Sequence, residues 1–194
     1  MGEIKTAFER AMEKIKDLEK ATPEEMRRME HVPRGEALAA RYLRGDINDL
    51  QAEIARHEAK VRAYLLEGAL EALLSNIALP RDSRTKQTNA KAMQGVLSLK
   101  KNSKRVKDGF DQIERVFTSY EAAVQQTYGQ LKQEFEAKLA QAKKSLEQQY
   151  GAPVKIDVEA YPQFQDEWRQ VRASLDVKYE QVLAEHKQGI RAGS

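Results

Sequence analysis

The chain has 194 residues, of which 32% are charged, 41% are apolar and 7% are aromatic, and it contains no cysteine. The lack of cysteine excludes disulfide bonds, thiolate catalysis and thiolate-bound zinc or iron–sulfur sites. Ala, Glu, Lys, Gln, Leu and Arg dominate the composition and favour helices, whereas ten glycines and five prolines provide few turns. The composition therefore predicts long helices with thin apolar seams and a charged surface.

The first expected element is an N-terminal helix whose seam consists of Ile4, Phe8, Ala11, Ile15 and Leu18. A second, short helix is expected to begin at Thr22-Pro23-Glu24-Glu25, which combines a capping hydroxyl, a first-turn proline and a capping-box acid. We expect Pro33 and Gly35 to end this helix. This N-terminal part of the chain is charged throughout and lacks the apolar core of a signal peptide.

A long helix is expected from Glu36 to the residue before Pro80, with Gly45-Asp46 as a possible interruption. If Gly45 is tolerated, this helix has about 44 residues and is roughly 65 Å long. The following residues 81–89 (RDSRTKQTN) are all polar and include several capping residues, so they are expected to form a loop.

The strongest apolar pattern follows a helical stretch that is expected to start at about Ala90. Its residues have 4-3 and then 4-4-3 spacing, up to a stop at Gly151 and Pro153. Residues 154–158 (VKIDV) alternate apolar and charged side chains, which is compatible with an extended strap or with a strand that pairs with a partner chain. A last helix is expected from about Gln163.

Short connections between helices favour antiparallel neighbours. The sequence therefore predicts an all-α fold: an elongated, coiled-coil-like antiparallel hairpin, with the shorter N- and C-terminal helices completing a four-helix bundle at its base. The whole chain, 1–194, is expected to be one domain. Residues 3–60 and 120–190 would form the base bundle, and residues 61–119 a two-helix arm with its tip near 80–89.

The charge is uneven, because residues 81–107 contain nine basic residues and one acid, a net charge of +8 within a chain of net charge +3. A concentrated basic segment attracts phosphates, anionic lipid headgroups or acidic protein surfaces. The candidate residues for contact with an anionic partner are Arg81, Arg84, Lys86, Lys91, Lys100, Lys101, Lys104, Arg105 and Lys107.

Three interpretations of this basic segment remain open: a solvated surface, a docking site for an acidic protein, and a binding site for nucleic acid or lipid. No aromatic residue occurs between Tyr64 and Phe110, so the segment offers no side chain for base stacking. Nucleic-acid binding, if present, would therefore show no base preference.

The sequence offers no catalytic or metal-binding constellation. His31, His57 and His186 are far apart, and Glu53 with His57 on one helix face lacks the second pair that di-iron bundles need. No HExxH, GxSxG or glycine-rich phosphate loop occurs, and Arg44-Gly45-Asp46 is interpreted as a helix interruption. We therefore expect no enzyme activity, no cofactor and no metal.

Aromatic residues at seam spacing are expected in the core (Phe110, Phe117, Tyr120, Tyr128, Phe135), and Trp168 is expected to anchor the last helix. The predicted function is a cytoplasmic, non-catalytic scaffold or adaptor that binds proteins. The alternative is binding of a nucleic acid or membrane surface through residues 81–107. A homo-oligomer is also expected, because the slim arm would need a second subunit to cover Leu65, Leu73, Val106, Phe110 and Phe117.

Overall fold

The computed structural model describes residues 6, 22–100, 103–151, 153 and 157–192. Within these residues every regular element is a helix and none is a strand, which confirms the all-α class. The helix predicted on residues 4–18 falls, apart from Thr6, outside the described residues, as does most of the 154–158 segment. Contacts divide the chain into two compact units, Met1–Ile77 with Gln87–Ser103 and Ala78–Lys86 with Lys104–Ser194.

Helix α2 (Pro23–Arg44) begins at the predicted capping box: the backbone N–H of Glu25 donates to the Thr22 hydroxyl, and the Thr22 N–H donates to the Glu25 carboxylate. The prediction that Pro33 and Gly35 end this helix is wrong, because both lie inside it. The helix instead ends at Gly45, whose φ of 91° is the left-handed conformation that glycine adopts at low cost.

The possible interruption at Gly45-Asp46 is confirmed, so a single helix from Glu36 to residue 79 does not form. After Gly45 the chain forms α3 (Leu50–Ala55), capped by Asp49 through the Ala52 N–H at 2.8 Å, and then α4 (Ala59–Ser75). The helical spacing of apolar residues continues across the breaks between α2, α3 and α4, because each of these helices also buries one apolar stripe. The spacing alone therefore does not reveal the breaks.

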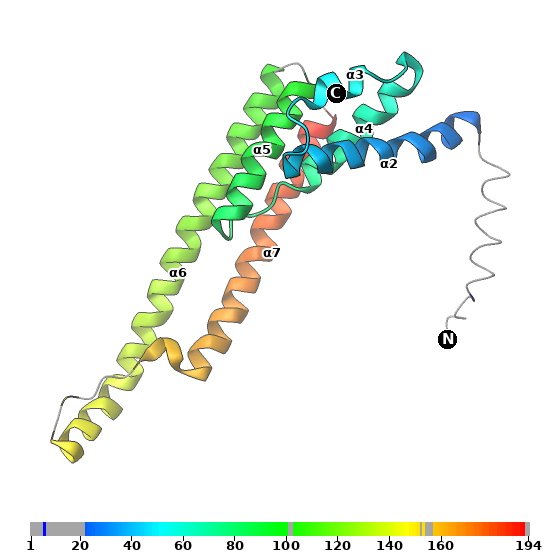
Figure 1. The fold of residues 1–194 in the computed structure, drawn as a ribbon. Helices are drawn as coiled ribbons and strands as arrows, with labels where there is room; N and C mark the ends of the chain where they lie inside the picture. The colour runs from blue at the N-terminus through cyan, green and yellow to red at the C-terminus, as the bar shows by residue number, and fades with distance from the viewer. Residues whose placement is uncertain (1–5, 7–21, 101–102, 152, 154–156, 193–194) are drawn as a thin grey trace. The chain divides into compact units, whose positions relative to one another are not determined.

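Helices α2 and α4 pack together in the first unit through backbone contacts at two glycines (Figure 1). A Cβ built on Gly35 would overlap the carbonyl oxygen of Leu65, and one built on Gly68 would overlap that of Val32. Ala39 and Ala69 are fully buried beside this contact. Small residues at these positions therefore let the two backbones approach closely.

Helix α5 (Ser83–Leu99) replaces most of the loop predicted for residues 81–89. Its start is capped by Asp82, whose carboxylate accepts hydrogen bonds from the Thr85 N–H at 2.7 Å and the Thr85 hydroxyl at 2.9 Å. The segment is polar because much of its surface is exposed, and not because it lacks helical structure. From Gln87 onward its residues belong to the first unit.

The second unit is built on α6 (Lys104–Tyr150) and α7 (Pro162–Ala192), joined through the short 3-10 helix η1 (Val158–Ala160). The two long helices lie side by side and run in opposite directions (Figure 1). Aromatic contacts show the register, with Tyr120 against Tyr179, Tyr128 against Trp168, and Phe135 against Phe164. The end of α6 at Tyr150 and the start of α7 at Pro162 match the predictions, whereas the helical stretch predicted from about Ala90 is divided, since α5 ends at Leu99 and α6 begins at Lys104.

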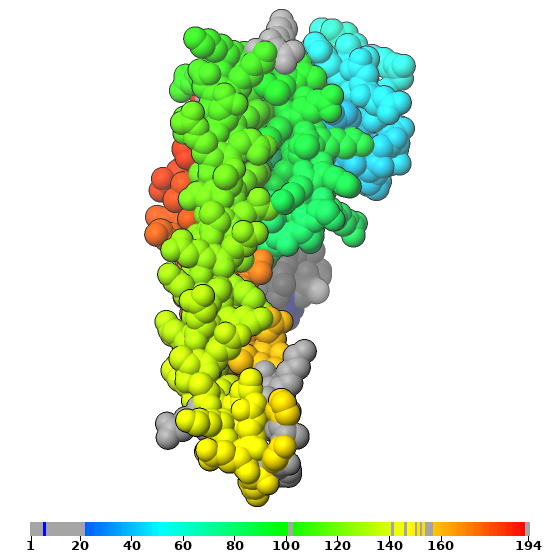
Figure 2. All heavy atoms as spheres, turned by 90° about the vertical axis from the view of Figure 1, so that its left-hand side faces the viewer, coloured from blue at the N-terminus to red at the C-terminus, as the bar shows by residue number. Residues whose placement is uncertain are grey.

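The predicted hairpin paired the helices on either side of residues 80–89, whereas the antiparallel partner of α6 in its unit is α7. Figure 2 shows the side chains of α6 as a continuous ridge on one face. The four-helix base bundle and the single-domain organisation stay predictions. Among the described residues, no helix combines the length and apolar character needed to cross a bilayer.

The residues expected to need a second subunit are buried within the single chain: Leu65, Leu73, Val106, Phe110 and Phe117 are each less than a tenth exposed. These five residues therefore do not need a second subunit to cover them. A homo-oligomer stays a prediction without that support.

Candidate functional site

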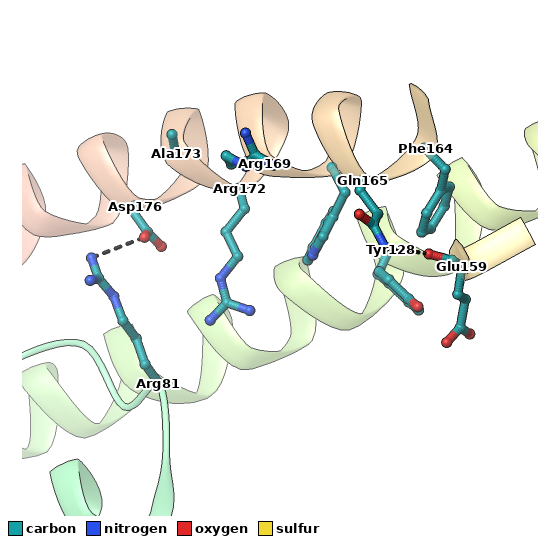
Figure 3. Close-up of a pocket in the computed structure, with 10 residues that line it drawn as sticks. Arg81, Tyr128, Glu159, Phe164, Gln165, Arg169, Arg172, Ala173 and Asp176 are labelled. Atoms are coloured by element: carbon teal, nitrogen blue, oxygen red, sulfur yellow. Dashed lines mark hydrogen bonds and ion pairs between the residues drawn. The ribbon is translucent and has the colours of Figure 1, made fainter. Parts of the chain in front are cut away.

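The candidate site is an open hollow of about 730 Å³ in the second unit, lined mainly by α7 and by parts of α6, η1 and the segment before α5. We call it the α6–α7 groove (Figure 3). Its lining residues are Arg81, Tyr128, Glu159, Phe164, Gln165, Trp168, Arg169, Arg172, Ala173 and Asp176. The α7 residues recur every three or four positions, so they form one stripe along the helix.

A cluster of buried apolar side chains between α6, η1 and α7 shares Phe164 with the lining of the groove. Leu131, Phe135, Val158 and Phe164 are buried there. Tyr128 packs edge-on against Phe164 and Trp168, with ring centroids 5.6 and 5.0 Å apart. These edge-to-face contacts hold the aromatic wall of the groove in one arrangement.

One end of the groove is closed by a network centred on Asp176 of α7. The Tyr120 hydroxyl of α6 donates to Asp176 Oδ1 at 2.6 Å, and Arg81 lies 2.9 Å from Oδ2. The same guanidinium pairs with Glu180 at 2.8 Å. Asp176 is mostly buried, so this network ties α6, α7 and the segment before α5 together within the unit.

The network also perturbs Tyr120, whose pKa is raised above its usual value, first by burial and then by the hydrogen bond to Asp176. Tyr120 therefore stays protonated and acts as a donor well into the alkaline range. The hydroxyl also accepts a long hydrogen bond, 3.4 Å, from Arg172.

At the other end, Glu159 of η1 receives a hydrogen bond from Lys132 of α6 at 2.5 Å. This bond, followed by one from Tyr128, lowers the pKa of Glu159. The pKa of Tyr128 is raised, first by burial and then by Glu159. Glu159 is therefore an ionised carboxylate at neutral pH, with its charge already compensated by Lys132.

The predicted basic residues are divided between the two units. Lys91 and Lys100 belong to the first unit, whereas Arg81, Arg84, Lys86, Lys104, Arg105 and Lys107 belong to the second. Lys101 lies outside the described residues. Binding of an anionic partner by this set stays a prediction.

Several of these cations have partners inside the chain. Arg81 pairs with Asp176 and Glu180, and Lys86 with Glu121. The Lys91 ammonium lies 5.4 Å from the ring centroid of Tyr42, and burial lowers the pKa of Lys100. Lys104, Arg105 and Lys107 are exposed. Among the described members of the predicted set, Arg81 alone lines the groove.

The sequence did not predict the groove. Trp168 was expected only as an anchor, and it does contact Tyr128 on α6. A signal was present in the 4-4 spacing of Trp168, Arg172 and Asp176, which places a ring, a cation and an acid on one face of α7.

No group of three or more metal-ligating side chains of the usual kinds comes together in the described part of the chain. Glu53 and His57, which the sequence placed at helical spacing, are separated by the end of α3.

No curated protein and no solved structure matches the chain. A family of unknown function, DUF6657, matches residues 51–192, a segment that includes the whole α6–α7 groove. The chain belongs to the DUF6657 family.

Proposed function

We propose that this protein is a non-catalytic helical adaptor that binds a segment of another protein in the α6–α7 groove. The observation that carries the proposal is the lining, in which Trp168, Tyr128 and Phe164 adjoin Arg169 and Arg172. Trp, Tyr and Arg dominate binding energies at protein interfaces, because they combine large contact areas with polar ends. The hollow of about 730 Å³ is also within the usual range for a specific binding site.

The polar groups of the lining favour binding over catalysis. Asp176 is engaged by Tyr120 and Arg81, and Glu159 by Lys132. The pKa of Glu159 is lowered, first by its hydrogen bond from Lys132, whereas a general acid near neutral pH needs a raised pKa. Among the lining residues that the structure describes there is no serine, threonine, cysteine, lysine or histidine to act as a nucleophile or base.

The support of the groove suits an adaptor. The lining residues project mainly from α6 and α7, which have 47 and 31 residues, rather than from mobile loops. Side chains on regular helices lose less freedom when a partner binds, so more of the contact energy appears as affinity. In this proposal the antiparallel α6–α7 pair is the scaffold, and self-association is not required.

The test is site-specific photocrosslinking in native lysate. A benzoylphenylalanine at Gln165, which is exposed and lines the groove, should form discrete protein adducts. The matched control places the same group at Gln181, which is exposed on α7 but does not line the groove. We expect the Gln165 adducts to disappear when Trp168→Ala is added. Identical adducts from both positions, or adducts unaffected by Trp168→Ala, would refute the proposal.

A further inference from the structure

Arg172 is a half-buried cation without a carboxylate partner among the described residues. Its guanidinium extends from α7 toward α6, into the groove (Figure 3). Toward the described residues of the groove it donates one hydrogen bond, to the Tyr120 hydroxyl at 3.4 Å, which is near the limit for such a bond. A partly desolvated guanidinium with free donors is a strong site for an incoming anion.

The two acids in the described lining of the groove, Asp176 and Glu159, already pair with other groups. Asp176 accepts from Tyr120 and pairs with Arg81, and Glu159 pairs with Lys132. The neighbouring Arg169 is exposed and pairs with Asp166 at 3.3 Å on its own helix. The charge left uncompensated in the groove is therefore positive and is centred on Arg172.

Next to this cation lies the aromatic wall. The Arg172 guanidinium carbon is 5.9 Å from the Trp168 ring centroid, and Trp168 packs against Tyr128. Trp168 and Tyr128 are both half-buried, so part of each side chain remains available to a partner. An occupant that satisfies both features carries an anionic group beside an apolar or aromatic one.

The length of the groove indicates a peptide rather than a small acid. Its lining extends along α7 from Phe164 to Asp176, which is about 18 Å at the rise of an α-helix. An extended chain covers this distance with about five or six residues.

We infer that the groove binds a short acidic peptide segment in which a carboxylate adjoins a large apolar side chain. Arg172 receives the carboxylate through two parallel N–H donors, and Trp168 with Tyr128 contacts the apolar side chain. This inference rests on the proposed function and specifies the chemistry of the partner.

The test uses Trp168 as a reporter, because it is the single tryptophan of the chain. Three blocked pentapeptides serve as probes for the full-length protein: Gly-Glu-Phe-Glu-Gly, its Gln analogue Gly-Gln-Phe-Gln-Gly, and Gly-Glu-Gly-Glu-Gly. We expect a saturable change in Trp168 emission with the first peptide. Binding of each of the other two should be at least about tenfold weaker, since each lacks one of the two recognised groups.

The variant Arg172→Gln should abolish the preference for Glu over Gln, and Arg172→Lys should retain part of it, because lysine keeps the charge without the paired donors. Lys178→Gln, an exposed change on α7 outside the groove, is the matched control and should leave the preference unchanged. Far-UV circular dichroism verifies that each variant is folded.

An equal preference in Arg172→Gln and wild type, equal binding of the Glu and Gln peptides, or no saturable change up to millimolar peptide would each overturn the inference. These outcomes leave the crosslinking test intact. Discrete adducts at Gln165 together with no carboxylate preference would retain the adaptor function and reject only the acidic partner.

Discussion

Gly35 of α2 and Gly68 of α4 form one reciprocal contact, in which each glycine lies against the backbone of the opposite helix. A Cβ on Gly35 would come within 2.9 Å of the Leu65 carbonyl carbon, and one on Gly68 within 2.9 Å of the Val32 carbonyl carbon. Backbone atoms cannot rotate away as side-chain ends do. The two helices can therefore approach this closely only if both positions lack a Cβ.

The first prediction is that Gly35→Ala and Gly68→Ala each destabilise the protein by about 1–3 kcal/mol, because overpacking forces the helices apart. The measurement is urea unfolding followed by circular dichroism. Gly129→Ala is the matched control, since a Cβ there meets nothing within 4 Å and α6 continues through this position. This control should stabilise the protein by about 0.5–1 kcal/mol. Similar effects at all three glycines would contradict the close contact.

The second prediction concerns the hydrogen bond from Tyr120 to Asp176. Tyr120→Phe should lower the free energy of unfolding by about 1.5–3 kcal/mol, because the lost bond is to a charged group. Tyr179→Phe should cost less, since the Tyr179 hydroxyl meets the exposed Ser119 hydroxyl at 3.1 Å. A larger loss for Tyr179→Phe would show that the Asp176 network is not the stronger link.

The third prediction is the pH dependence of the same bond. The folded pKa of Tyr120 is raised above the usual value of 10.0, first by burial. The unfolded chain therefore loses this proton first, and the stabilisation falls as pH rises above 10. The stability difference between wild type and Tyr120→Phe should shrink between neutral pH and about pH 11 in urea titrations. A difference that stays constant across this range would contradict the raised pKa.

The fourth prediction concerns the capping box of α2. The pKa of Glu25 is lowered, first by the Thr22 backbone N–H and then by its hydroxyl. The cap is therefore complete above the ordinary pKa of 4.5 and is lost as pH falls through the folded value. Carboxyl-carbon NMR should show the lowered pKa, and Thr22→Ala should bring it partly back toward 4.5. An unchanged titration in Thr22→Ala would mean that the hydroxyl contributes nothing.

The fifth prediction tests the basic segment. We expect weak binding to duplex DNA and anionic vesicles, without base preference, that declines linearly with salt on a log–log plot. Replacing the exposed Lys104, Arg105 and Lys107 with Gln should abolish this binding. Lys86→Gln is the control, because Lys86 is already paired with Glu121. No binding even at low salt would eliminate the polyanion function.

Local patterns determined how much of this fold was predictable. The end of α6 and the course of α7 followed from apolar repeats sustained over many turns, and the start of α2 followed from Thr22 and Glu25. The start of α6 at Lys104 did not follow from them. Pro33 and Gly35 misled because the same residues that end helices also permit close packing. Which of the two occurs depends on a partner far away in the sequence, here α4.

The groove illustrates the same limit. Helical spacing places Trp168, Arg172 and Asp176 on one face of α7. No local rule shows that Arg81, nearly a hundred residues earlier, pairs with Asp176, or that Tyr128 contacts Trp168. Such pairings depend on how the helices associate. In a sequence with this many charged residues, each charged side chain has many potential partners.

The match to DUF6657 begins at residue 51, whereas α2, the packing partner of α4, ends at Arg44. A fragment that retains only the matched segment would lose the backbone that lies against Leu65 and Gly68. Leu65 and Ala69, which are almost entirely buried in the full chain, would then be exposed as an apolar patch and promote aggregation. The segment that defines the family, residues 51–192, is therefore shorter than the segment that the first unit needs for its packing, which also includes α2.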